Sequence, residues 1–86
     1  MSDEIPVETA MALGKIVREV LDSRGMPRGK MLAFLRDFAL KYYYAHKKGL
    51  DDYKEDLKEA YASWGVPMDV LDEVAKKIES RYSRRE

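Results

Sequence analysis

The same helix-ending sequence occurs twice in this chain, at positions that differ by 40 residues. Glu19–Pro27 aligns with Glu59–Pro67, and the glutamate, serine, glycine and proline are identical in the two segments. A glycine at the end of a helix favours a left-handed cap, and a proline shortly after it favours the start of the next helix. The recurrence therefore predicts two helical hairpins, one over about 6–48 and the other over about 51–82.

The recurrence has two possible origins. Glycine and proline are preferred in any short connection between helices, so the two turns could have converged. Matching apolar positions continue over about 30 residues, which favours a true structural repeat. Both origins predict the same all-α fold, a compact four-helix domain built from two pseudo-repeated helix-turn-helix hairpins, with 83–86 as a frayed tail.

Apolar spacing gives each expected helix a buried face. The second helix, which ends near Lys48, is apolar around most of its circumference, as is typical of a central helix that touches several neighbours. Within the first helix, Gly14 costs about 1 kcal/mol relative to alanine. With Ala10 one turn earlier, it predicts a flat strip against which a neighbouring helix packs closely. The predicted core is Leu13, Val17, Leu21, Leu35, Phe38, Tyr42, Leu57, Tyr61, Trp64, Val70, Val74 and Ile78.

Charged residues of the second hairpin predict local stabilising contacts. Asp52 and Glu55 fit a capping box at the start of the third helix. Asp72 and Glu73 each precede a lysine by four residues, an arrangement that stabilises a solvated helix.

Composition limits the class of protein. The 86 residues have room for one domain with a modest core. Cysteine is absent, as are asparagine and glutamine, and 37% of the residues are charged, which indicates an intracellular protein from a thermophile. The acidic start is unlike a signal peptide, and the longest apolar run, Met31–Leu35, is far shorter than a bilayer span. We therefore expect a soluble, cytoplasmic protein.

The charges balance overall, with 16 basic and 16 acidic residues, but they are unevenly distributed. Basic residues dominate from Arg24 to Lys48, and acidic residues dominate from Asp51 to Glu79. This split predicts a small non-enzymatic helical interaction module that binds a protein partner, or a second copy of itself, through a basic surface of the second helix. The candidate contact residues are Arg24, Arg28, Lys30, Arg36, Lys41, Tyr44 and Lys48.

No pattern in the sequence predicts a catalytic site, a bound metal or a cofactor. His46 is the only histidine, and the chain has no cysteine to share a metal with it, so we expect a structural or surface role. The acidic run Asp51–Asp56 superficially resembles a calcium loop. Such a loop needs glycine at its sixth position and a carboxylate at its twelfth, where Ala62 stands, so the run is better explained as a solvated helix start.

Nucleic-acid binding is the first alternative function. The turn at Gly25, followed by Arg28 and Lys30, suits a DNA-binding helix-turn-helix, with Arg36 and Lys41 in reach of phosphates. The second turn fits the same template although acidic residues follow it, so the template has little specificity here.

Lipid binding is the second alternative. The length and the expected helical hairpins resemble those of saposin-like domains, which open around an apolar interior. The resemblance is to the helical layout alone, because the six cysteines of that family are absent from this chain.

Overall fold

A computed structural model of the protein describes residues 5–82, which form four helices. The helices are α1 Val7–Ser23, α2 Gly29–Lys48, α3 Asp51–Ser63 and α4 Met68–Arg81. Residues 5–82 include no strand, and the helices pack into one compact bundle, so the predicted all-α four-helix fold is confirmed. The predicted frayed tail at 83–86 lies outside the described residues.

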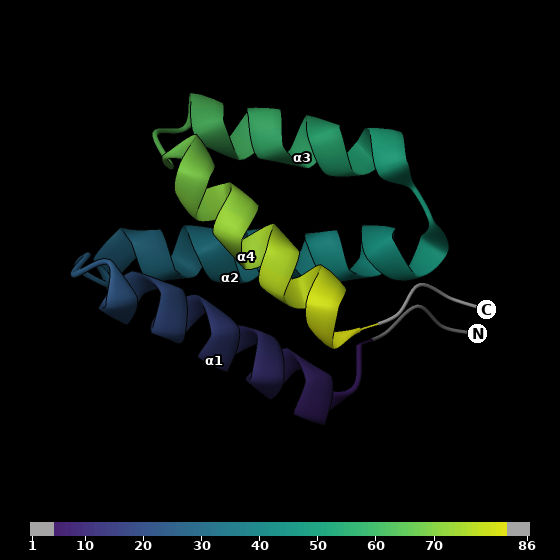
Figure 1. Cartoon of the computed structure of the whole chain (residues 1–86), viewed down its shortest axis with the longest axis horizontal. Coiled ribbons are helices and arrows are strands. Elements are labelled where there is room, and N and C mark those ends of the chain that lie inside the picture. The colour runs from purple at the N-terminus through teal and green to yellow at the C-terminus, as the bar shows by residue number, and fades with distance from the viewer. Residues whose placement is uncertain (1–4, 83–86) are drawn as a thin grey trace.

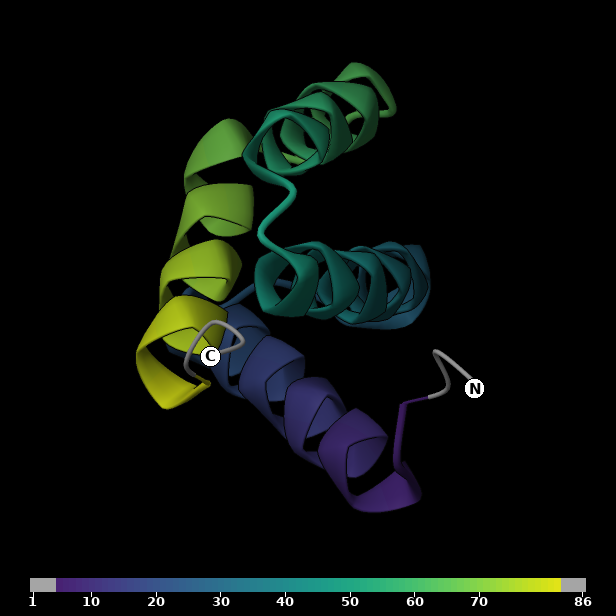
Figure 2. The ribbon, with the colours of Figure 1, turned by 90° about the vertical axis from the view of Figure 1, so that its right-hand side faces the viewer.

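The helix α2 is central, as predicted from its wide apolar arc. It packs against α1, α3 and α4, whereas α1 and α3 do not touch within the described part of the chain. Figure 1 shows α1 and α3 on opposite sides of α2, with α4 crossing α2 diagonally. Figure 2 shows the first turns of α1 projecting beyond the other helices. One long face of α1 is therefore left without a helical neighbour.

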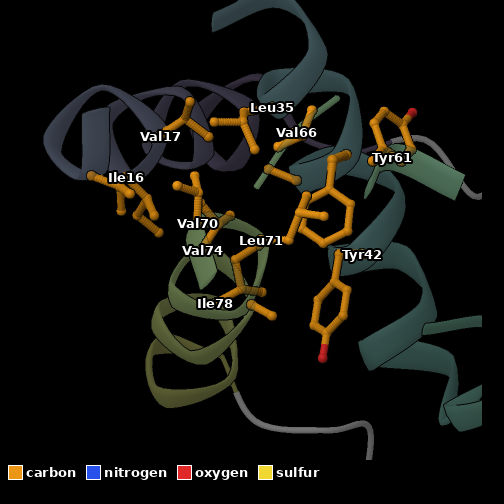
Figure 3. Close-up of a cluster of buried hydrophobic side chains, with 14 of the residues drawn as sticks. Ile16, Val17, Leu35, Tyr42, Tyr61, Val66, Val70, Leu71, Val74 and Ile78 are labelled. Carbon is orange, nitrogen blue, oxygen red and sulfur yellow. The ribbon is translucent and has the colours of Figure 1, made fainter. Parts of the chain in front are cut away.

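The apolar faces of all four helices meet in a single hydrophobic core. In Figure 3, Ile16 and Val17 of α1 lie beside Val70 and Val74 of α4. Burying a side chain of this size contributes about 1.5–3 kcal/mol relative to leaving it exposed. All of the predicted core residues except Trp64 are buried.

The prediction for Trp64 was wrong, because its side chain is 59% exposed. The apolar period assumed that α3 continues through this residue, but α3 ends at Ser63 and Trp64 is its C-cap. The indole lies at the surface beside Phe34 and Tyr61, with ring centroids 5.7 and 5.0 Å away. Val66, just after the turn, is buried instead.

Three of the helices end with one hydrogen-bond pattern. At each of these ends, the glycine amide donates to the carbonyl three residues earlier, and the next amide donates to the carbonyl five residues earlier. The glycine bonds are Gly25 to Asp22, Gly49 to His46 and Gly65 to Ala62. The bonds of the following residues are Met26 to Leu21, Leu50 to Ala45 and Val66 to Tyr61. This is the glycine-dependent cap predicted at Gly25 and Gly65, whose φ angles are +65° and +104°. The pattern also follows α2, outside the proposed repeat, so the structural repeat stays a prediction.

Two helix starts differ from the prediction. The helix α2 begins at Gly29, two residues after Pro27, whereas α4 begins directly after Pro67, which makes the first connection one residue longer. The capping box does not form, because α3 starts at Asp51 and places Asp52 inside the first turn. The acidic first turn still stabilises α3 through the helix dipole.

Alanine at Gly25 or Gly65 should destabilise the fold by about 1–2 kcal/mol, because a Cβ disfavours the left-handed backbone. A Cβ added at either position meets nothing within 4 Å in the surrounding described structure, so backbone strain alone causes the loss. Asparagine, which tolerates this conformation better, should cost less. Urea unfolding measures the effect, and alanine variants as stable as the parent protein would contradict the assigned caps.

Candidate interaction surface

Two of the predicted contact residues are engaged in ion pairs near the first turn. Arg24 joins the end of α1 to α4, with Nη1 2.9 Å from Asp69 Oδ2 and Nε 2.7 Å from Glu73 Oε1. Arg28 donates to both carboxylate oxygens of Asp22, at 2.7 and 3.3 Å. The positive charges of both arginines are thus offset within the molecule.

Lys41 takes part in a contact between α2 and α3. Its Nζ lies 3.1 Å from Asp37 Oδ2 and 3.3 Å from the hydroxyl oxygen of Tyr61, and this hydroxyl donates to Asp37. The hydrogen bond from Tyr61, reinforced by the ammonium group of Lys41, lowers the pKa of the Asp37 carboxyl. At the far end of α2, Lys48 Nζ lies 5.7 Å from the ring centroid of Tyr44.

The acidic residues of α4 form tertiary pairs rather than the predicted local ones. Asp72 Oδ1 lies 3.2 Å from Lys58 Nζ of α3, and Glu73 pairs with Arg24. Because α4 packs against α1 and α3, Arg24 and Lys58 pair with these carboxylates in place of the lysines one turn further along α4. Part of the basic-to-acidic attraction predicted for a partner is therefore used inside the molecule.

The last two predicted contact residues, Lys30 and Arg36, are exposed and form no ion pair with any described residue. Arg36 faces α1, where a Cβ built on Gly14 would lie 3.8 Å from Arg36 Nε and 3.5 Å from Arg18 Nη1. Together with Lys15, these side chains line an open groove of about 350 Å³ over Gly14. We call it the basic groove, and Lys15, Arg18 and Arg36 have no ion-pair partner among residues 5–82.

The sequence prediction included Arg36 but missed Lys15 and Arg18. Gly14, Lys15 and Arg18 are spaced so that they share one face of α1. This spacing was a usable signal. The predicted close approach of a neighbouring helix at Gly14 is made by a side chain: Gly14 is buried, and Arg36 of α2 lies over it together with Arg18.

A buried polar cluster joins α2, α3 and α4. The side chain of Lys54 is only 9% exposed, and its Nζ lies 3.0 Å from His46 Nδ1 and 3.2 Å from Glu79 Oε2. The Tyr42 hydroxyl donates to the same Glu79 oxygen. His46 Nε2 lies 2.8 Å from the carbonyl oxygen of Tyr82, so this nitrogen carries the hydrogen and Nδ1 accepts from Lys54.

Within this Lys54 cluster, the surroundings of Tyr42 and Glu79 shift the pKa values of both side chains. Burial, then the hydrogen bond to the Glu79 carboxylate, raise the pKa of Tyr42, so its hydroxyl remains a donor. For Glu79, burial favours the neutral acid, but hydrogen bonds from Tyr42 and Lys54 and the charge of Lys54 outweigh it and lower the pKa of the carboxyl. The polar atoms of the cluster bond one another, so it acts as a structural clamp between the hairpins.

Other kinds of site are not formed by the described residues. Within 5–82, no group of three or more histidine, aspartate or glutamate side chains is placed to hold a metal ion. In the acidic run at the start of α3, Asp51 forms an ion pair with Lys54, with Asp51 Oδ1 3.6 Å from Lys54 Nζ. In the same part of the chain, no helix combines the length and apolar character needed to cross a membrane.

Comparisons with known proteins give no match. No protein-family model matches the chain, and no curated protein or solved structure is significantly similar to it.

Replacing Lys54 with methionine should destabilise the fold by about 1–3 kcal/mol, because it leaves His46 Nδ1 without its donor and removes a bond to Glu79. Methionine keeps most of the side-chain length, so packing changes little. Lys77→Met is the matched control, since Lys77 is exposed on α4, and it should change stability by about 0.5 kcal/mol or less. Equal losses in the two variants, measured by chemical unfolding, would contradict the clamp.

The contribution of Glu79 to the free energy of unfolding should depend on pH. Because its pKa in the folded protein lies below the ordinary value of 4.5, the carboxylate stabilises the fold above pH 4.5, and this stabilisation is lost as the pH falls through the folded-state pKa. Glu79→Gln should therefore be less stable than the parent protein at pH 7, and the difference should shrink below about pH 4.5. A difference that stays constant from pH 7 to pH 3 would be inconsistent with a carboxylate held by Lys54 and Tyr42.

Proposed function

We propose that this protein is a small, non-enzymatic interaction module that binds an acidic surface of a protein partner through the basic groove. The supporting observation is the contrast between two sets of cations. Arg24 and Arg28 bind carboxylates of the same molecule, whereas Lys15, Arg18 and Arg36 have none among the described residues. An acidic ligand therefore binds the basic groove without displacing an ion pair between residues of 5–82.

Apolar side chains beside the groove also support a protein partner. Met11 lines the groove and is 68% exposed, and Val7, one turn earlier on α1, is 74% exposed. Methionine and arginine are enriched where proteins meet, whereas lysine is depleted there. The groove thus combines an attractive charge with surface that gains from being covered.

The alternatives make different demands on the molecule. A duplex DNA bound at the first turn would meet the carboxylates of Asp22, Asp69 and Glu73, which lie beside Arg24 and Arg28. A saposin-like lipid site would require the bundle to open its packed core. Self-association would pair the groove with the acidic α3 of a second copy. Duplex DNA is the competing ligand in the test of the proposal.

Poly-L-glutamate, an acidic polypeptide that is unfolded at pH 7, provides a direct test. The double variant Arg18→Glu/Arg36→Glu should bind it about tenfold more weakly than the parent protein, because two attractions become repulsions of about 0.4 kcal/mol each. Binding should also weaken with added salt. Isothermal titration at low ionic strength measures both effects.

The matched control is Lys30→Glu/Lys77→Glu, which makes the same charge change at two exposed residues outside the groove. This control should retain most of the affinity. Tighter binding to random duplex DNA than to polyglutamate, with loss in the Lys30→Glu/Lys77→Glu protein, would overturn the proposal in favour of nucleic-acid binding. Equal affinities of the two double variants for polyglutamate would also overturn it.

A further inference from the structure

The floor of the basic groove contains a glycine that the fold itself does not need. Gly14 lies inside α1, where glycine is less favourable than alanine. An added Cβ would meet only Arg18 Nη1 at 3.5 Å and Arg36 Nε at 3.8 Å, which are ordinary contacts with the mobile ends of long side chains. Alanine therefore fits at this position in the free protein, so packing within residues 5–82 gives no reason for glycine.

The outward stripe of α1 changes character along its length. Val7, Met11, Gly14 and Arg18 follow one another at helical spacing, so they share one face. The stripe begins with two exposed apolar side chains, passes over Gly14, which is buried beneath the ends of the Arg18 and Arg36 side chains, and ends among three cations. From Val7 to Arg18 it rises about 16 Å, which is about three turns of helix.

From these features, and resting on the proposed function, we infer that the basic groove receives an amphipathic α-helix of a partner protein. The apolar side chains of this helix cover Val7 and Met11, its backbone passes close over Gly14, and its acidic end lies among Lys15, Arg18 and Arg36. Exposed anchors, a flat crossing point and complementary charge match the way amphipathic helices bind grooves.

A helix fits this surface better than an extended peptide. Beyond the first and last turns, the amide and carbonyl groups of α1 and α2 bond within their own helices, and the described chain has no strand edge to which an extended ligand could add. An extended backbone covered by this face would lose water without gaining partners, which is unfavourable. A helix satisfies its own backbone and needs only side-chain contacts.

A second copy of the chain is a poorer occupant. Two α1 stripes related by a two-fold axis through Gly14 would bring both sets of Lys15, Arg18 and Arg36 together, and like charges would repel. Pairing the groove with α3 of another copy would join opposite sides of the molecule head to tail, which gives either a closed ring or an open chain of subunits (Figure 1). The charge of the groove therefore favours an acidic helix from a different protein.

The test selects ligands from two displayed peptide libraries of identical composition, rich in glutamate and leucine. In one library the leucines recur at helical spacing (i, i+3, i+4, i+7), and in the other their order is scrambled. The wild-type protein should enrich binders from the helical library. The Gly14→Leu variant, in which the added side chain fills the floor of the groove, should not bind these peptides. The Gly14→Ala variant should bind them with about tenfold lower affinity.

Gly14→Ala separates binding from folding. Its thermal unfolding midpoint should equal or exceed that of the parent protein, because alanine favours the helix. The inference would be overturned if the Gly14→Ala and Gly14→Leu proteins bind the selected helical peptides as tightly as the wild-type protein does.

Three further outcomes are distinguishable. Equal enrichment from both libraries, with the polyglutamate result intact, would overturn the helical occupant and leave the proposed function standing. Absence of binders from both libraries, together with no polyglutamate binding, would overturn both. A concentration-dependent rise in sedimentation coefficient that Gly14→Leu abolishes would replace the foreign helix by a second copy.

Discussion

Burial of the apolar face of α4 against the other three helices joins all four helices into one bundle. Val70, Leu71, Val74 and Ile78 are almost completely buried, and α4 touches α1, α2 and α3, whereas α1 and α3 do not touch each other in the described structure. The same packing sets the polar contacts at the edges of α4. It brings the acidic residues of α4 to Arg24 and Lys58, and it brings Glu79 to the Lys54 cluster. The core therefore decides which charges are satisfied internally.

The surface that remains for recognition follows from this arrangement. The acidic side chains of α4 offset Arg24 near the first turn, and Asp37 offsets Lys41 beside α3. Within residues 5–82, no other helix covers Val7 and Met11 of α1, so these apolar side chains are exposed beside the cations around Gly14. The stripe also keeps a glycine that weakens α1 and that internal packing does not require. Stability given up at a position of this kind is typical of a binding surface.

The sequence predicted what depends on local periodicity and missed what depends on distant contacts. The four helices, the central place of α2 and the glycine caps could be predicted, because apolar spacing and turn chemistry report them directly. Trp64 was misplaced because one residue beyond a helix end the period no longer applies. The burial of Lys54 could not be predicted, since it depends on His46 and Glu79, which lie on two other helices. The turns that suggested a repeat have the same geometry as the turn at Gly49, so they reflect helix-ending chemistry whether or not the halves are related.

The central claim is that the fold leaves the outer stripe of α1, with Arg36 of α2, as its free recognition surface. The most direct measurement is the map of backbone amide chemical-shift changes when polyglutamate is added to the ¹⁵N-labelled protein at low ionic strength. Changes confined to residues near 7–18 and around Arg36 are expected. Changes concentrated at 24–30, or spread along the paired charges of α4, would contradict the claim.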